Sequence, residues 1–481
     1  MALDAIIRID ITGLRGFAST GSMSLAVPDG RPGSGLTVIT GANSAGKSVV
    51  VEALRAMQHP GQDRSFPERT RNAAATSRVG IQLHYGAGQS QTLCTVPEGG
   101  SEMEWRHVGS FTPAEILAVP SRRAFNPAFG KEVLTRGTYA QATSGSGERP
   151  LSQDRFGGRL FQIQKNRAAF NAVLGKVLDP LPNWYIEKGQ SYFVRIEAGS
   201  GYHDSEGMGD GITSLFVIID ALYDSPPGSV IAIDEPELSL HPSLQRRLAR
   251  LLAEYARERQ IVVATHSTYF VDPTLLAMGM QLRRLTTDRQ QGTKIHELSN
   301  ATGERLARLA TDLNNPHTLG LDAREALFQE DGLLLLEGQE DVQLLAKVLN
   351  EAGVSVDLPP FGWGVGGADK MPAIAQMFHE LGFEKVVCIL DSNKSDLAAS
   401  LRATFPRYCI ACWPADDIRT KPARQIASVK GLLDENYRLR EEYRESTAAL
   451  LKKASDYLNP PVPATAPAFA QAQPDSDSAP A

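Results

Sequence analysis

The chain has 481 residues, of which 42% are hydrophobic and 22% are charged, and its formal net charge is −6. This length predicts about two to four domains, and the negative charge argues against a protein that holds nucleic acid by overall charge alone. The four cysteines are too few for a disulfide framework and indicate a reducing compartment, so we expect a cytoplasmic protein.

The first segment, residues 6–27, alternates apolar and polar residues and predicts strands with turns. Asp4 and Asp10 lie where a signal peptide would need an uninterrupted apolar core, so we expect none. The chain contains no run of about 18 apolar residues, so we expect no membrane span and no membrane partner.

The sequence GANSAGKS, residues 41–48, fits the phosphate-loop pattern G-x-x-x-x-G-K-[ST]. It lies between an apolar strand, LTVIT, and a helical pattern, VVVEALRAM, as the motif requires. Lys47 should reach the β- and γ-phosphates, and Ser48 should place its hydroxyl on Mg²⁺. The alternative is a glycine-rich loop without a ligand. We assign to ATP binding Gly41, Asn43, Gly46, Lys47 and Ser48.

A different kind of sequence follows the strand ILAVPSRRAF, which ends in Arg122 and Arg123. Residues 125–195 combine a polar Gly/Ser stretch with a helical pattern, and we interpret them as a helical insertion within the first domain. Such an insertion is a candidate dimerisation arm. Further on, residues 205–222 predict a glycine-rich turn that opens an apolar helix, for which an ordinary helix start is the alternative.

The sequence VIAIDEPELSLHP, residues 230–242, predicts a buried parallel strand that delivers Asp234 and Glu235 to the carboxyl edge of a sheet. ATP hydrolysis needs one acid to hold Mg²⁺ and another to polarise water. The alternative is a strand that merely ends in an acidic turn. One helix later, IVVATHS predicts a neighbouring strand that ends in His266.

Together these segments resemble the ATP-binding-cassette ATPases over about residues 1–300, within an expected domain of residues 1–315. The resemblance implies that Lys47 and Ser48 bind phosphate and Mg²⁺. Asp234 would orient the metal, Glu235 would be the general base, and His266 would sense the γ-phosphate. It also implies that Gly209, in the signature loop, caps a nucleotide of a second copy, so we expect a homo-oligomer. Met208 departs from the transporter pattern, which has Ser there.

A second α/β domain is expected over residues 325–455. The apolar strand GLLLL ends at Glu337, Asp341 lies one turn into the next helix, and KVVCIL ends at Asp391. Because parallel strands deliver their ends to one edge, these carboxylates should converge. They would repel one another unless Mg²⁺ or Mn²⁺ neutralised them, and two such ions can clamp a phosphodiester.

This half resembles the Toprim fold, and the whole resembles the OLD (overcoming lysogenization defect) family of nucleases. That resemblance implies Mg²⁺- or Mn²⁺-dependent DNA cleavage in defence against phage, with Glu337 and Asp391 catalytic and DNA as a partner. Asn393 replaces the second Asp of the family's Asp-x-Asp motif, so a metal ligand loses its charge. Asp396, or the pair Asp416 and Asp417, would be substitutes; Lys421 and Lys430 are candidates to stabilise charge.

Two hypotheses follow for the function. The first is an ATP-regulated, metal-dependent DNA endonuclease; the second is an ATPase sensor and scaffold whose degenerate Toprim domain holds and releases a separate effector toxin. A DNA-repair ATPase with coiled-coil arms is disfavoured because no heptads are sustained. The segment from residue 459 to 481 is rich in Pro and Ala and is expected to be disordered.

Overall fold

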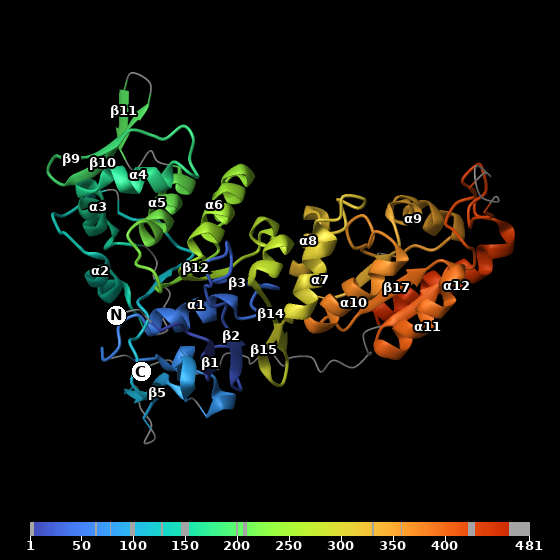
Figure 1. Cartoon of the computed structure of the whole chain (residues 1–481), viewed down its shortest axis with the longest axis horizontal. Coiled ribbons are helices and arrows are strands. Elements are labelled where there is room, and N and C mark those ends of the chain that lie inside the picture. Colours follow the sequence, from blue (N-terminus) through green and yellow to red (C-terminus); the bar gives the residue numbers. More distant parts are fainter. Residues whose placement is uncertain are drawn as a thin grey trace, which may run out of the picture.

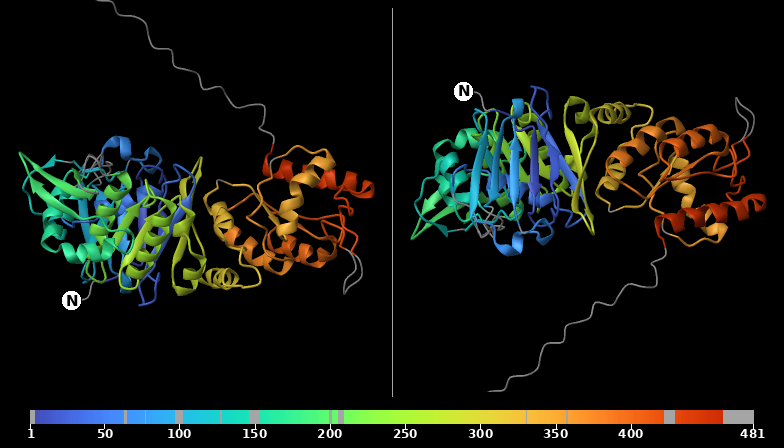
Figure 2. Two further views of the ribbon diagram at one scale, coloured as in Figure 1. Left: turned by 90° about the horizontal axis from the view of Figure 1, so that it is seen from above. Right: turned by 90° about the horizontal axis from the view of Figure 1, so that it is seen from below.

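The computed structural model contains two α/β modules that lie side by side, as Figures 1 and 2 show. It describes residues 4–62, 65–76, 78–96, 102–126, 128–145, 153–198, 201–204, 209–329, 331–356, 358–421 and 429–460. The phosphate loop, both acidic strands and the strand that precedes His266 fall within these ranges. The predicted disordered tail lies outside them from residue 461 onward.

The first module is built on a six-stranded sheet of order β15-β14-β3-β13-β12-β7. All neighbouring strands in it are parallel except the edge hairpin of β14 and β15. The apolar runs LTVIT, VIAID and QIVVA form central strands that are buried along their whole length, as parallel strands covered on both faces require. The strands are β3 (Leu36–Gly41), β7 (Ile116–Val119), β12 (Val230–Asp234), β13 (Gln260–Ala264), β14 (Gln281–Asp288) and β15 (Gly292–Glu297).

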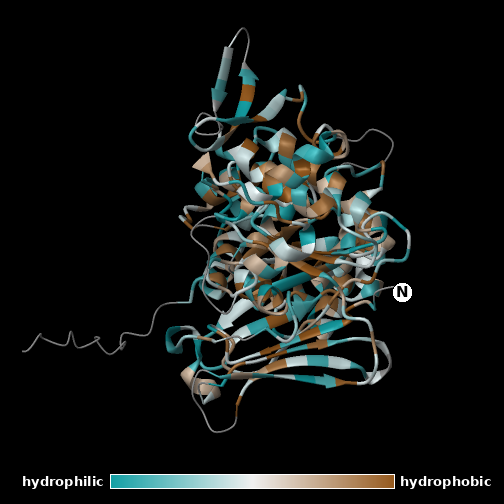
Figure 3. Ribbon diagram, turned by 90° about the vertical axis from the view of Figure 1, so that its left-hand side faces the viewer, coloured by the Kyte–Doolittle hydropathy of each residue, from teal (hydrophilic) through white to brown (hydrophobic). Residues whose placement is uncertain are grey.

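A second, antiparallel sheet of order β2-β1-β4-β5-β6 faces the parallel sheet across helix α1 (Lys47–Ala56). Buried and partly exposed residues alternate along β1, β4 and β5, and Figure 3 shows this alternation as bands of colour. The predicted early strands are therefore present. They are β1 (Arg8–Thr12), β2 (Gly21–Ser24), β4 (Gly80–His84), β5 (Ser90–Thr95) and β6 (Met103–Val108).

The opposite face of the parallel sheet is covered by α5 (Asp210–Tyr223), α6 (Pro242–Tyr255) and α7 (Asn300–Ala310). Helix α5 is apolar on most sides because it packs between this sheet and the insertion. Among the described residues, the helices lack the combination of length and continuous apolar sequence that a membrane-spanning segment requires.

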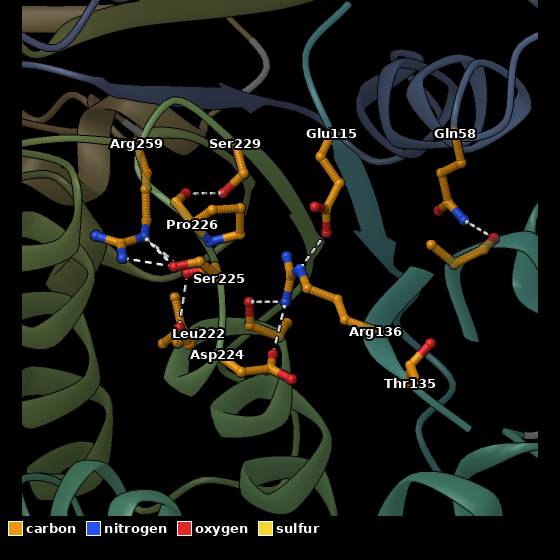
Figure 4. Close-up of polar contacts among 12 residues, drawn as sticks. Gln58, Glu115, Thr135, Arg136, Leu222, Asp224, Ser225, Pro226, Ser229 and Arg259 are labelled. Atoms are coloured by element: carbon orange, nitrogen blue, oxygen red, sulfur yellow. Dashed lines mark hydrogen bonds and ion pairs between the residues drawn. The ribbon is translucent and has the colours of Figure 1, made fainter. Parts of the chain in front are cut away.

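In its described residues, the insertion predicted as helical contains three helices and also a small antiparallel sheet, which continues past the predicted end at residue 195 to Asp204. The helical pattern of residues 154–178 led to this expectation, and the strands β8 and β9 are short and partly exposed. Arg136 fastens the insertion to the module: its buried guanidinium contacts Glu115, Asp224 and the carbonyl of Ala221 (Figure 4). The elements are β8 (Ala128–Phe129), α2 (Arg136–Thr143), α3 (Phe156–Lys165), α4 (Arg167–Leu174), β9 (Trp184–Lys188), β10 (Tyr192–Ala198) and β11 (Gly201–Asp204).

The second module has a parallel sheet of order β16-β17-β18 with helices on both faces. Helices α9 and α12 pack on one face and α10 and α11 on the other. The expected order of strand, helix, turn, helix and strand is therefore observed. The elements are α8 (Leu321–Glu325), β16 (Leu333–Leu336), α9 (Gln339–Ala352), α10 (Met371–Glu380), β17 (Val386–Leu390), α11 (Ser395–Thr404), β18 (Cys409–Cys412) and α12 (Glu441–Leu458).

The two modules share one hydrophobic core, which runs from the parallel sheet through α7 and α8 to α10. A buried arginine of β14, Arg284, crosses this junction. It donates to the carbonyls of Leu381 (3.0 Å) and Gln329 (3.1 Å), and its guanidinium lies 3.7 Å from the centre of the Phe383 ring. Since β14 pairs with the phosphate-loop strand β3, the second module is attached next to the first module's site.

Candidate functional site

The loop between β3 and α1 has the geometry of a phosphate cradle. Gly41 and Gly46 have φ values of +131° and +103°, which side-chain-bearing residues rarely adopt. A Cβ atom on Gly41 would lie 2.2 Å from the carbonyl oxygen of Leu285, so this position also needs glycine for space. Asn43 lies on the same loop. The loop ends where α1 begins at Lys47, so the positive end of the helix dipole faces the cradle.

Lys47 and Ser48 lie at the start of α1, beside the acidic strand end. The Lys47 ammonium is buried and donates to the carbonyls of Gly41 and Ala42, both at 2.9 Å. Burial lowers the pKa of Lys47 to about 8, although neighbouring carboxylates oppose this shift. The Ser48 hydroxyl donates to Asp234 Oδ1 at 3.0 Å. The two predicted Mg²⁺ ligands of this module thus come together from segments 186 residues apart.

Glu235 and His266 face each other at the ends of adjacent strands, β12 and β13. His266 Nε2 lies 4.0 Å from Glu235 Oε1. Glu235 has a φ of 49°, a left-handed conformation that is uncommon for this residue type, and its N–H donates to the Ala264 carbonyl at 2.7 Å. Burial, followed by the nearby Lys47 charge, lowers the pKa of His266. Neutral His266 can therefore accept or donate a hydrogen bond beside the predicted general base.

Glu237 is a site residue that the sequence reasoning missed. Its carboxylate accepts from the Thr265 hydroxyl at 2.7 Å and from the His266 N–H at 2.6 Å. It thereby holds the backbone at the end of β13 against the turn after β12. Burial raises its pKa. The second Glu of the DEPE sequence was the available signal, but nothing in the sequence indicates which strand it contacts.

Arg123 was noticed only as the end of an apolar strand, and the structure gives it a position beneath the acidic turn. The side chain is buried, with 3% exposed. Its guanidinium donates to the carbonyls of Asp234 and Glu235, both at 2.7 Å, and to the hydroxyl of Ser214 on α5 at 2.6 Å. Burial lowers its pKa to about 10. Arg123 therefore fixes the backbone that carries the Asp234 and Glu235 carboxylates and connects it to α5.

The helix expected to follow a signature loop is α5, and Gly209 is its N-cap residue. Residues 205–208 of the predicted loop, including Met208, lie outside the described residues. The first turn of α5 approaches the turn that follows β12: a Cβ atom on Gly211 would lie 2.5 Å from the Ser239 carbonyl oxygen. A nucleotide-capping role for Gly209 stays a prediction.

In the second module, Glu337, Asp341 and Asp391 gather at the carboxyl edge of β16 and β17. The Asp391 N–H donates to Glu337 Oε1 at 2.8 Å, and Asp341 Oδ2 accepts from the Gly338 N–H at 2.9 Å. Burial raises the pKa of Asp341 to about 6. Burial, with the charges of Glu337, Asp341 and Asp417, raises the pKa of Asp391 to about 8. The buried Asp391 Oδ1 has no hydrogen-bond partner among the described residues.

The predicted substitutes for the missing acid lie on the loop after β18. Asp417 adds to the field at Asp391 and pairs with Lys421. Asp416 instead accepts from the Ser392 hydroxyl, and its carbonyl accepts from the Asn393 amide at 3.2 Å. Within the described ranges, no three His, Cys, Asp or Glu side chains are already arranged as a metal-binding group. The carboxylates of the cluster therefore repel one another, but they do not surround one point at metal-binding distance.

Comparison with known proteins bears on the first module. Residues 121–272 match the family model described as "AAA domain, putative AbiEii toxin, Type IV TA system". No curated protein matches the chain. The match to an AAA-domain model and the phosphate-loop geometry together support an ATPase, which binds and hydrolyses ATP.

Among solved structures, the SMC head domain from Thermotoga maritima is 14% identical with a TM-score of 0.37, over 61% of this chain and 99% of that one. The Smc head domain from Pyrococcus furiosus, bound to the C-terminal domain of ScpA, is 12% identical with a TM-score of 0.42, over 64% and 99%. At scores this low the likeness carries no argument about function.

Proposed function

We propose that ATP binding and hydrolysis in the first module regulate a Mg²⁺- or Mn²⁺-dependent DNA endonuclease site in the second. The observation that carries this proposal is the buried carboxylate cluster of Glu337, Asp341 and Asp391, in a module that Arg284 attaches to the strand beside the phosphate loop. A cluster of this kind binds divalent cations, and its position allows nucleotide-driven movement to reach it.

At the ATP site, the residues present fit a Mg²⁺ ion because the Ser48 hydroxyl and Asp234 Oδ1 already lie 3.0 Å apart. When bound, the ion would neutralise charge on the β- and γ-phosphates. Lys47 would move from its carbonyl partners to the phosphates. Glu235 would remove a proton from the attacking water, and His266, 4.0 Å from it, would contact the γ-phosphate side.

In the second module, the unpartnered oxygen of Asp391 and the raised pKa of its carboxyl fit a site that binds a cation. Glu337, Asp341 and Asp391 would supply the charged oxygens, and Asn393 a neutral one. Metal ions held there would place the scissile phosphate and generate the nucleophile from water. Lys421, which pairs with Asp417, lies close enough to the cluster to affect Asp391 electrostatically.

The proposal includes a homo-oligomer, since Gly209 opens α5 at the surface of the ATPase module and would cap a second copy's nucleotide. It also includes a role in defence against phage, which rests on the resemblance to the OLD family. The toxin–antitoxin context in the matched family's description is compatible with such a role.

A second function is favoured by one observation. The Asn393 amide donates to the Asp416 carbonyl, and the Asp416 carboxylate accepts from the Ser392 hydroxyl. The polar groups on this side of the cluster are therefore already paired with one another. If the second module binds no metal, the chain would act as an ATPase sensor and scaffold that holds and releases a separate effector toxin. ATP turnover would then serve release instead of DNA cleavage.

The deciding experiment is cleavage of supercoiled plasmid by the full-length protein with Mg²⁺ or Mn²⁺, with and without ATP. We expect nicked or linear product that disappears in Glu337→Gln, while ATP hydrolysis continues. Glu445→Gln, on the exposed face of α12, is the matched control and should cut as the wild type does. Absence of cleavage under every condition, with ATPase activity intact, would favour the scaffold.

A further inference from the structure

A cavity of about 620 Å³ lies on the side of the ATPase module away from the phosphate loop. Its walls come from α6, from α8 and from the short 3-10 helices Thr268–Phe270 and Pro273–Met278. This volume falls within the range of about 300–1,000 Å³ that is typical of small-molecule sites. None of the residues assigned to ATP or to the acidic cluster lines it.

Four arginines surround this cavity. Arg246, Arg250 and Arg257 follow one another along one face of α6 and its extension, and Arg324 enters from α8. None of the four forms an ion pair within the described part of the chain. Guanidinium groups recognise phosphate through paired N–H donors. Arg324 donates to the Leu319 carbonyl at 3.0 Å, but no carboxylate among the described residues neutralises any of the four through an ion pair, and this excess of positive charge favours an anionic ligand.

The floor of the cavity is apolar. It includes Leu36 and Val38 of β3 and Val263 of β13, all buried, together with Phe270. Tyr269 provides an aromatic wall and already stacks with a guanidinium, since Arg246 lies 5.0 Å from its ring centre. An inorganic anion would leave this floor uncovered, so the complementary ligand has a flat or apolar body as well as negative charge.

Two carboxylates, Glu254 and Asp272, also line the cavity. Glu254 is paired with Lys176 at 3.1 Å, and Asp272 accepts from the Thr274 N–H and hydroxyl. Their remaining acceptor capacity would repel a fatty acid but would suit the N–H groups of a heterocyclic base. A ring, N–H donors and phosphate charge occur together in a nucleoside phosphate.

The cavity wall continues directly from the predicted γ-phosphate sensor. Tyr269 and Phe270 follow His266 by three and four residues. Ser267 lies between His266 and Tyr269, and its hydroxyl donates to Gln245 of α6 at 2.6 Å. A ligand that shifts Tyr269 would therefore shift the backbone that carries His266.

We propose that this cavity is a second nucleotide site, which binds a nucleoside phosphate between the α6 arginines and Arg324 and thereby changes the rate of ATP hydrolysis. It is separate from the phosphate loop, and it does not depend on the nuclease proposed above. The phosphate would contact Arg250 and Arg324, and the base would lie on the apolar floor beside Tyr269.

The test is calorimetric titration of the full-length Lys47→Ala protein, in which the phosphate loop cannot contribute, with AMP, adenosine and pyrophosphate. We expect one AMP per chain, and at least about tenfold weaker binding of adenosine and pyrophosphate, because each carries half of the recognised chemistry. Adding Arg250→Gln should weaken AMP binding about tenfold or more, as expected for loss of a charge-assisted hydrogen bond. Arg308→Gln, an exposed arginine of α7 outside the cavity, is the matched control.

Arg250 is exposed and makes no hydrogen bond among the described residues, so its variant should fold normally. No AMP binding, equal effects of Arg250→Gln and Arg308→Gln, or pyrophosphate binding as tight as AMP would each overturn the site. With Lys47 intact, AMP should change phosphate release from ATP differently in the wild type and in Arg250→Gln. Identical AMP responses would overturn the regulatory part, because competition at the phosphate loop affects both proteins equally.

Discussion

The two modules each bring carboxylates to the carboxyl edge of a parallel sheet, but they neutralise them differently. In the ATPase module, Asp234 accepts from Ser48, Glu237 accepts from Thr265 and the His266 N–H, and the Lys47 ammonium lies nearby. Hydrogen bonds therefore hold Asp234 and Glu237 in place before nucleotide binds.

In the second module, the charges of Glu337, Asp341 and Asp417 on Asp391 outweigh that of Lys421, and one of the buried Asp391 oxygens has no described partner. The same strand-end geometry thus yields a site held by hydrogen bonds where Ser48 and Thr265 donate to the carboxylates, and an electrostatically strained one where buried carboxylates face one another. A proton on Asp391, or the divalent cation proposed above, would relieve the repulsion at the second edge.

Removing the predicted general base of the ATPase module should have the largest effect on activity. We expect Glu235→Gln to lower ATP turnover by about 10²–10⁴-fold, the usual contribution of general base catalysis. ATP binding should persist, because Lys47, Ser48 and Asp234 are unchanged. Phosphate release and fluorescent-nucleotide binding measure the two quantities separately; turnover within a few-fold of wild type would assign the base elsewhere.

Removing Arg123, which supports the backbone of the acidic turn, should have the second-largest effect. Arg123→Met would leave the buried carbonyls of Asp234 and Glu235 without their donor, at a cost of about 1–3 kcal/mol for each unsatisfied group. We expect a lower free energy of unfolding in chemical denaturation and a kcat reduced at least about tenfold, with partial rescue by Arg123→Lys. A stability loss with unchanged kcat would show that Arg123 does not position the carboxylates.

Removing the charge of Asp391 from the second module should increase the stability of the folded protein. The pKa of Asp391 is about 8 in the folded chain, against about 4 in an unfolded one. Folding therefore takes up a proton between these values, and stability falls as pH rises from about 4 to 8. In EDTA, Asp391→Asn should raise the melting temperature by a few degrees at pH 8 and flatten this dependence.

The same experiment has a metal arm. Mg²⁺ or Mn²⁺ should raise the melting temperature of the wild type, since a ligand bound only by the folded state stabilises it, and should not raise that of Asp391→Asn. A wild type that is indifferent to both ions would argue against a metal site in the second module.

Adding a charge to the strained edge should have the smallest effect. Asn393→Asp would restore a carboxylate where the side chain now donates to the Asp416 carbonyl. We expect metal affinity, measured by calorimetry, to increase about three- to tenfold, because a neutral ligand becomes anionic. Weaker binding would mean that the Asn393 amide contact is what keeps the loop after β17 in place.

Much of this arrangement was predictable from local sequence. Apolar runs that end in polar residues predict the phosphate loop, the order of elements in the second module, and the strands that lead to Asp234, His266, Glu337 and Asp391. The contacts that support these side chains could not be predicted. Arg123 meets Asp234 across 111 residues and Ser48 meets it across 186, and no local pattern encodes such pairings. Among the strands of the insertion, β8 and β9 are short and lack clean alternation, but β10 has seven residues with alternating buried Val194 and Ile196, so its pattern was available and was missed.

Arg284 has a further consequence for how this protein can be divided. The change in composition near residue 320 invites a truncation that would isolate either half. A cut there would remove the carbonyls that accept from Arg284 and would expose the apolar residues of the shared core to water. The two halves are thus a single folding unit, and a gene fragment that ends at this junction should yield aggregated protein.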